Sequence, residues 1–171
     1  VQMQTVEHLL AALYAMGIDN LFIEIDGEEV PIGDGSAAPF VTLLNEAGQQ
    51  EQDRIRHCVK IVEPITLTDK VKTQTSEVTK SIRVTPGASF EVSYTIAFHH
   101  PLIATQSYVY RHSPEAFIRE IAPARTFGFL KDVKRLLEQG LAQGGSLENA
   151  VVVDENKVLN VEGLRFHDEF V

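Results

Sequence analysis

The sequence has no tryptophan, one cysteine and few basic residues. The single cysteine, Cys58, excludes an internal disulfide and favours a reducing compartment, so we expect a cytoplasmic protein. A net charge of -9 argues against a bulk nucleic-acid binder. The longest charge-free apolar stretch, Leu9 to Ile18, has 10 residues, which is too short for a transmembrane segment. We expect no signal peptide, because Glu7 and His8 interrupt the first apolar run.

The composition is that of a folded globular protein. Of the 171 residues, 44% are hydrophobic and 23% are charged, which suffices for a core and excludes wholesale disorder. The length fits one ordinary domain or two small ones. The chain begins with Val1 rather than methionine and ends at Val171 without a closing element, so we expect a piece of a longer protein.

Local patterns divide the chain into two blocks. In residues 1–50, apolar residues at helical spacing predict a helix that ends at Gly17. Residues 20–26 predict a short strand, and Ser36 caps a second helix that runs to Leu44. The polar stretch 49–54 lacks periodicity and is interpreted as a linker.

The second block, residues 51–171, is richer in strands. Helices are predicted over 113–121 and 131–139. Strands followed by helices favour an α+β layered fold over a doubly wound parallel sheet. The predicted strands are 58–67, 81–85, 90–98, 106–110 and 150–153.

Glu7 and His8 open a helix that is otherwise without charge. His8 shares one side with Ala11, Ala12 and Ala15, and the opposite side is apolar, so we expect both faces of this helix to be covered. The partial positive charge of a helix N-terminus favours neutral imidazole and ionised carboxylate, the forms required of a metal ligand and a general base. A hydrogen-bonded core histidine beside a helix-start glutamate explains these residues equally simply.

Two further segments allow both a structural and a functional interpretation. Residues 31–36, Pro-Ile-Gly-Asp-Gly-Ser, lead into a helix start and could receive an anion, although they lack the lysine and spacing of a Walker loop. The alternative interpretation of residues 31–36 is an ordinary turn followed by a helix cap. Residues 124–129, Ala-Arg-Thr-Phe-Gly-Phe, could hold an oxyanion and stack a ring. They could equally be a strand with both aromatic residues on one face, and the pair His99 and His100 is interpreted as a strand end.

In this order, the segments resemble the zinc-dependent UDP-3-O-acyl-N-acetylglucosamine deacetylase family of lipid A biosynthesis. The resemblance covers essentially the whole chain and favours the functional interpretations. It also implies that the family's opening strands and its later zinc ligands, a second histidine and an aspartate, lie outside this sequence. The matching segments are Thr5–Leu13, Glu29–Ser36, Ala124–Phe129, Gly144–Asn149 and Val151–Phe166.

The resemblance implies a two-domain α+β protein in which each domain layers helices on a β-sheet. Residues 1–50 would be the C-terminal part of the first domain, and 51–171 a second domain that is incomplete at its C-terminus. A βαβ insert, which forms the acyl passage, would span about residues 128–160. The active site would lie between the domains.

The resemblance also implies catalytic and metal-binding roles. Glu7 matches the general base that activates the zinc-bound water, and His8 matches one Zn²⁺ ligand. Thr126 matches the hydroxyl that stabilises the oxyanion, and Asp34 matches a supporting acidic residue. Gly33 departs from the family, which usually has a larger apolar residue there.

The implied partner is UDP-3-O-acyl-N-acetylglucosamine. Phe127 matches the wall at the mouth of the acyl passage, and Phe129 and Asp132 fall where the family contacts the nucleotide. We expect a monomer, and we expect the chain by itself to be inactive. The alternative is a non-catalytic remnant that binds the acyl-UDP-sugar without hydrolysing it.

Overall fold

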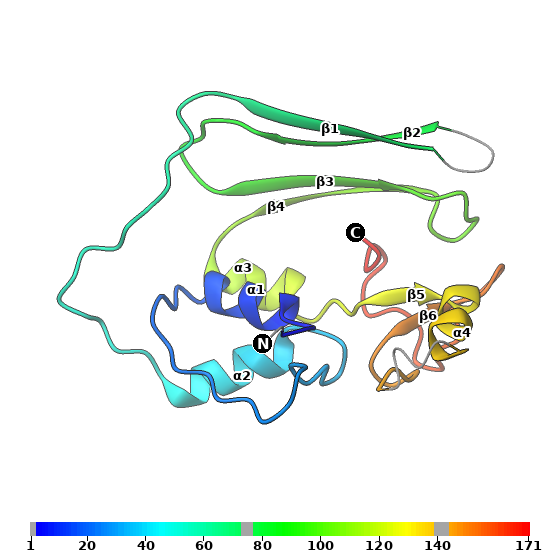
Figure 1. Ribbon diagram of the computed structural model, residues 1–171, viewed down its shortest axis with the longest axis horizontal. Coiled ribbons are helices and arrows are strands. Elements are labelled where there is room, and N and C mark those ends of the chain that lie inside the picture. The colour runs from blue at the N-terminus through cyan, green and yellow to red at the C-terminus, as the bar shows by residue number, and fades with distance from the viewer. Residues whose placement is uncertain (1–2, 73–76, 139–143) are drawn as a thin grey trace. The chain divides into compact units, whose positions relative to one another are not determined.

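A computed structural model describes residues 3–72, 77–138 and 144–171, apart from the side chains of residues 136 and 137 (Figure 1). It contains helices and small sheets, which confirms the α+β class. Its contacts form two compact units, one made of Val1–Glu51 with Glu91–Val171 and the other of Gln52–Phe90. The expected assignment of 1–50 and 51–171 to two domains stays a prediction.

The helices lie in the larger unit and follow local signals. Helix α1, Glu7–Ala15, is followed by a turn at Gly17, whose φ of 73° allows the Ile18 N–H to bond back to the Leu13 carbonyl at 2.9 Å. Ser113 accepts a hydrogen bond from the Ala116 N–H at 3.0 Å and so caps the next turns. The remaining helical elements are α2 (Ala38–Ala47), α3 (Pro114–Ala116), the π-helical turn η1 (Phe117–Ile121) and α4 (Leu130–Glu138).

The strands form three two-stranded sheets. In the larger unit, β3 (Glu91–Ala97) and β4 (Thr105–Arg111) are antiparallel. Strands β5 (Phe127–Phe129) and β6 (Val151–Val153) are parallel, and α4 lies between them in the chain. The smaller unit contains the antiparallel pair β1 (Ile65–Lys72) and β2 (Glu77–Val84).

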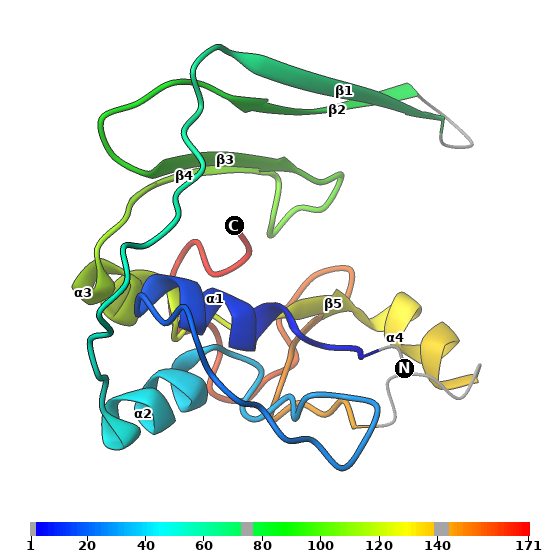
Figure 2. The same cartoon turned by 60° about the vertical axis from the view of Figure 1, so that its left-hand side comes forward.

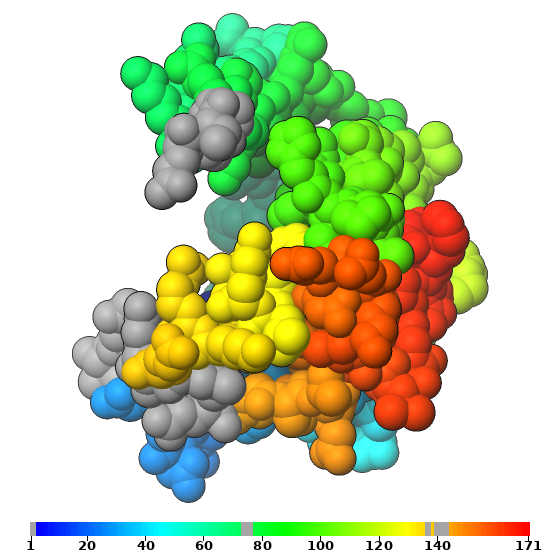
Figure 3. Space-filling model, turned by 90° about the vertical axis from the view of Figure 1, so that its right-hand side faces the viewer, coloured from blue at the N-terminus to red at the C-terminus, as the bar shows by residue number. Residues whose placement is uncertain are grey.

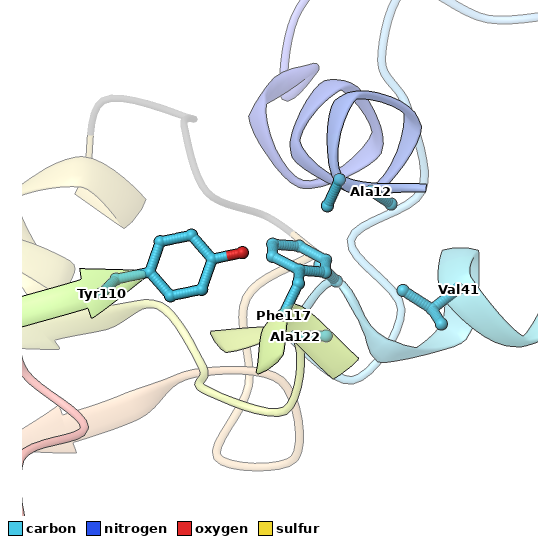
Figure 4. Close-up of a cluster of buried hydrophobic side chains, with 7 residues drawn as sticks. Ala12, Val41, Tyr110, Phe117 and Ala122 are labelled. Atoms are coloured by element: carbon cyan, nitrogen blue, oxygen red, sulfur yellow. The ribbon is translucent and has the colours of Figure 1, made fainter. Parts of the chain in front are cut away.

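Two apolar clusters form the core of the larger unit. In the first, small residues let α1 approach α2, and the two helices lie side by side in Figures 1 and 2. Figure 4 shows the Phe117 ring between Tyr110 and Val41, next to Ala12 of α1. The second cluster joins β3 and β6 to the end of the chain and consists of Ile96, Ile103, Val151, Val153 and Phe170.

The exposure of α1 differs between its two sides. Ala12 and Ala15 are buried and His8 is half-buried, whereas Ala11 is exposed, so the alanine-rich side is covered in part. On the other side Leu10 is 54% exposed and Tyr14 51% exposed. The prediction that both faces are covered was therefore wrong for this apolar side, which remains open within the described part of the chain.

Two strand predictions were wrong. Residues 20–26 form no strand, and Phe22 is fully exposed. The predicted strand at 58–67 begins only at Ile65. A strand needs a partner strand for its backbone N–H and C=O groups, and among the described residues neither 20–26 nor 58–64 takes part in a β-ladder or β-bridge.

Candidate functional site

Thr126 lies where the segments singled out in the sequence meet. Its N–H donates to the Gly35 carbonyl at 2.8 Å, and its carbonyl accepts from the Val151 N–H at 2.9 Å. The residue itself is exposed, and no hydrogen bond of its hydroxyl is found among the described residues. The backbone is thus held from two sides while the hydroxyl remains available to a ligand.

Gly35 brings the 31–36 loop into direct contact with the backbone of Asn149. Its φ is +83°, and a Cβ built on it would lie 1.9 Å from the Asn149 carbonyl oxygen. Both the positive φ and the close approach require glycine. The loop therefore packs against the segment that precedes β6, beside Thr126.

Asp34 fixes the same loop through its carboxylate. It accepts hydrogen bonds from the Ser36 N–H at 3.1 Å and the Ser36 hydroxyl at 2.7 Å, and it pairs with Arg165 at 2.9 Å. Burial by itself would raise the pKa of Asp34, but these hydrogen bonds and the positive charge of Arg165 lower it below its usual value. Asp34 is therefore an ionised anchor for the loop.

A buried ion pair lies directly beside Thr126. The side chains of Arg125 and Glu169 are 1% and 0% exposed, and Arg125 Nε donates to Glu169 Oε1 at 2.8 Å. Arg125 also donates to Glu162 at 2.6 Å and to the Gly163 carbonyl at 2.7 Å. Burial would raise the pKa of Glu169, but the bonds from Arg125 and from the Arg165 N–H lower it, so the carboxylate stays charged.

Phe127 and Phe129 follow Thr126 on β5 and belong to a cluster of rings. The ring centroid of Phe98 lies 5.8 Å from that of Phe127 and 5.6 Å from that of Phe129. The His100 ring is 5.4 Å from Phe129, and Lys131 Nζ lies 5.8 Å from the Phe129 centroid, within cation–π range. Phe127 and Phe129, which the sequence singled out, therefore share one cluster of rings with Phe98 and His100, which lie earlier in the chain.

A cavity of about 630 Å³ opens next to these rings. Phe98, His100 and Phe129 line it together with Lys131, Lys134 and Asp154. Figure 3 shows the face where β5 and α4 (yellow) meet the segment that follows β6 (orange). Aromatic faces beside two lysines offer stacking for a ring and positive charge for an anion.

The orientation of His100 follows from its partners. Its Nε2 lies 2.7 Å from the Asp154 carbonyl oxygen, which can only accept, so Nε2 carries the proton. Its Nδ1 accepts from the Leu102 N–H at 3.3 Å. His100 therefore joins the end of β3 to the loop after β6.

Glu7 and His8 lie in the first turn of α1. Glu7 is exposed, whereas His8 Nδ1 is shielded from solvent and without a hydrogen-bond partner in the described structure. The backbone before them is tied to residues 28–30, because the Gln4 N–H bonds to the Glu28 carbonyl at 3.0 Å and the Val30 N–H to the Gln4 carbonyl at 3.1 Å. An unpaired buried imidazole nitrogen is costly unless something binds it, and a metal ion is one such partner.

The described residues contain no cluster of three or more histidine, cysteine, aspartate or glutamate side chains that could hold a metal ion. A catalytic zinc site needs three protein ligands. His8 is therefore suited to supply one ligand, and the described residues do not complete a site around it.

The predicted residues fall into separate groups. Thr126, Phe127 and Phe129 are adjacent, and Asp34 joins them through the Gly35–Thr126 hydrogen bond. Among the described residues, no hydrogen bond or ion pair joins Glu7 or His8 to that group. Asp132 lies in the first turn of α4, pairs with Arg135 at 3.0 Å and does not line the cavity.

The sequence patterns did not identify several residues of the site. Phe98 and His100 were interpreted as a strand end, although both line the cavity beside Phe129. Glu169 was missed because it lies 44 residues from Arg125 in the chain. A possible signal for the cavity was the pair Lys131 and Lys134, which follow the aromatic residues at helical spacing.

In the part of the chain that the structure describes, no helix has the length and apolar character required to span a bilayer.

The comparisons with known proteins match the chain along its whole length. The profile of the LpxC family, described as UDP-3-O-acyl N-acetylglycosamine deacetylase, matches residues 1–171. The UDP-3-O-acyl-N-acetylglucosamine deacetylase of Myxococcus xanthus (strain DK1622) is 51% identical over 171 residues, 100% of this chain and 52% of that protein. The enzymes of the same name from Syntrophotalea carbinolica and Pasteurella multocida are 50% and 46% identical over 100% of this chain, covering 53% and 54% of their own lengths. The chain therefore spans about half the length of the curated relatives it matches.

Proposed function

The chain belongs to the UDP-3-O-acyl N-acetylglycosamine deacetylase family, and we propose that the full-length protein removes the N-acetyl group from UDP-3-O-acyl-N-acetylglucosamine in lipid A biosynthesis. The proposal rests on one observation: all 171 residues match relatives of that name, two of which are 51% and 50% identical to this chain. The reaction is the hydrolysis of an amide, with water as nucleophile, acetate as one product and the free amine of the sugar as the other.

We propose that His8 is one ligand of a catalytic Zn²⁺ ion and that Glu7 is the general base. Zn²⁺ lowers the pKa of a bound water and polarises a carbonyl, which is the chemistry that amide hydrolysis requires. The unpaired, buried Nδ1 of His8 fits a metal-ligating histidine. Glu7 is exposed in the same helical turn, where its carboxylate can accept a proton from the attacking water.

We propose that Thr126 donates a hydrogen bond to the oxyanion that forms as water adds to the acetyl carbonyl. Two observations support this role: its backbone is bonded on both sides, and its exposed hydroxyl has no partner among the described residues. A donor held in place before the reaction needs no reorganisation when the charge develops. Asp34 supports Thr126 by fixing the loop that accepts the Thr126 N–H.

We propose that the cavity beside Phe129 binds the UDP group of the substrate. Phe129 offers a face for stacking, and Lys131 and Lys134 offer positive charge to a diphosphate. Asp132 stays a proposed nucleotide contact, supported only by its place one residue from Lys131.

The acyl chain is assigned to a passage at Phe127 and the βαβ insert at about residues 128–160. The parallel β5–β6 pair with α4 between its strands supports such an insert. Among its apolar residues, Leu141 and the side chains of Leu136 and Leu137 lie outside the described residues. Val151 is fully buried in the core and does not present a surface to the acyl chain.

The proposal extends to organisation and location. We propose the two-domain arrangement of helices layered on sheets that the sequence predicted, and a monomer in the cytoplasm. The exposed, unpaired thiol of Cys58 is compatible with a reducing compartment.

The test uses the full-length protein, loaded with Zn²⁺, and measures acetate release from UDP-3-O-acyl-N-acetylglucosamine. We expect Glu7→Gln to retain its zinc and to lower turnover by roughly 10²-fold or more, because general-base catalysis typically contributes about that much. Glu46→Gln, a change at an exposed glutamate of α2, is the matched control and should leave turnover unchanged. Equal rates for Glu7→Gln and the unmodified protein would remove Glu7 from the base role. Tight substrate binding with no acetate release by the unmodified protein would favour the non-catalytic binder.

A further inference from the structure

We propose that the buried ion pair of Arg125 and Glu169 positions Thr126 for the reaction, an inference that rests on the oxyanion role proposed for Thr126. Arg125 and Glu169 would act through Thr126, and neither would contact the substrate.

The residue before Thr126 is held by one carboxylate at both its backbone and its side chain. The Arg125 N–H donates to Glu169 Oε1 at 3.0 Å, and Nε donates to the same oxygen at 2.8 Å. A terminal guanidinium nitrogen donates to Glu169 Oε2 at 3.2 Å. This fork fixes the peptide unit between Ala124 and Arg125, one unit before Thr126, because moving it would break the backbone bond and strain the side-chain bonds together.

The ion pair is also joined to the loop that receives the Thr126 N–H. Glu169 Oε2 accepts from the Arg165 N–H at 2.6 Å. The Arg165 guanidinium bonds to Asp34 at 2.9 Å and to the Pro123 carbonyl at 2.9 Å. Since Asp34 precedes Gly35, the bonds form a closed ring through Thr126, the loop, Arg165, Glu169 and Arg125.

Burial and geometry distinguish this pair from the other ion pairs of the described chain. Both of its side chains are buried, whereas in the Arg111–Glu91 pair they are 78% and 44% exposed. A buried ion pair stabilises a fold no better than apolar side chains of similar volume. The pair instead fixes the orientation of the groups that it joins, because each of its hydrogen bonds has a fixed donor and acceptor.

The closing experiment is a double-mutant cycle in the full-length enzyme, with kcat and KM measured for Glu169→Gln, Thr126→Ala and both changes together. Glu169→Gln would turn an amide NH₂ either toward the Arg125 N–H and Nε, or toward the Arg165 N–H and a terminal guanidinium nitrogen of Arg125. We expect kcat to fall by about 10²-fold with little change in KM, the cost of a misplaced catalytic group. In the Thr126→Ala background the same change should lower kcat by less than about 3-fold, because the group it positions is gone.

Glu91→Gln is the matched control, because it breaks an exposed ion pair in the same unit and should leave kcat unchanged in both backgrounds. If Glu169→Gln fails to fold by circular dichroism, Glu162→Ala takes its place in the cycle. The Glu162 side chain is 55% exposed and bonds to Arg125 at 2.6 Å, so the expected result is a smaller loss of the same non-additive kind.

The outcomes separate the two proposals. A Thr126→Ala enzyme with normal kcat would overturn the oxyanion role itself. A slow Thr126→Ala enzyme, combined with an equal loss from Glu169→Gln in both backgrounds, would overturn only the positioning role of the ion pair.

Discussion

Replacement of Gly35 by alanine tests whether the junction at Thr126 is as closely packed as the structure shows. The new Cβ would lie 1.9 Å from the carbonyl oxygen and 2.6 Å from the carbonyl carbon of Asn149, whereas ordinary contacts begin at 3.4 Å. Both Asn149 atoms belong to the backbone, so no side-chain rotation relieves the overlap. The loop and the segment before β6 must therefore separate.

The expected loss of stability has three parts. An alanine held at the φ of +83° costs about 1–2 kcal/mol in the left-handed region. Separation of the loop also breaks the hydrogen bond from Thr126 to Gly35, which contributes about 0.5–1.5 kcal/mol. With the packing lost at Asn149, we expect Gly35→Ala to lower the free energy of unfolding by about 3–4 kcal/mol.

Gly17→Ala is the matched control. Gly17 has a φ of +73°, but nothing lies within 4 Å of an added Cβ, so only the backbone cost applies. Urea unfolding of both variants of the full-length protein measures the difference. We also expect kcat to fall by about 10²-fold in Gly35→Ala alone, because Thr126 moves with the loop. Equal losses of stability in the two variants would refute the close approach at Asn149.

Three further predictions concern Thr126, Glu169 and the proposed zinc ligand His8. Thr126→Ala in the full-length enzyme should raise the activation free energy by about 2–4 kcal/mol through kcat, since an oxyanion contact strengthens only in the transition state; a pure rise in KM would indicate a substrate-positioning hydroxyl instead. Stability should fall as the pH drops through and below 4.5, the ordinary pKa of glutamate, because the lowered pKa of folded Glu169 means that the unfolded state binds the proton first; urea midpoints between pH 6 and about pH 3 test this, and a flat profile would contradict it. The 171-residue chain made by itself should lose Zn²⁺ on dialysis and release no acetate, because His8 is its one proposed ligand; metal analysis that found stoichiometric zinc would show that other residues of this chain complete the site.

The helices could be predicted from the sequence because their signals are local. Gly17 ends α1, and Ser113 caps α3, through bonds to residues only a few positions away. The placement of Glu7 and His8 in the first turn of α1 was predictable for the same reason. The absence of a strand at 20–26 was not predictable in this way, because a strand exists only with a partner strand, and a local pattern does not show whether a partner is present.

In the candidate site, too, some features follow from local sequence and others depend on long-range contacts. The sequence singled out Thr126, Phe127, Phe129 and Asp34 by residue type and by resemblance, but their arrangement depends on contacts between distant segments. Glu169 reaches Arg125 across 44 residues, and Gly35 needs to be glycine because of Asn149. The sequence by itself determined the helix that carries Glu7 and His8 and the identity of the candidate site residues. Only the tertiary structure decided how Thr126 is held and which rings and lysines share a cavity, because long-range hydrogen bonds and packing form only when the chain brings those segments together.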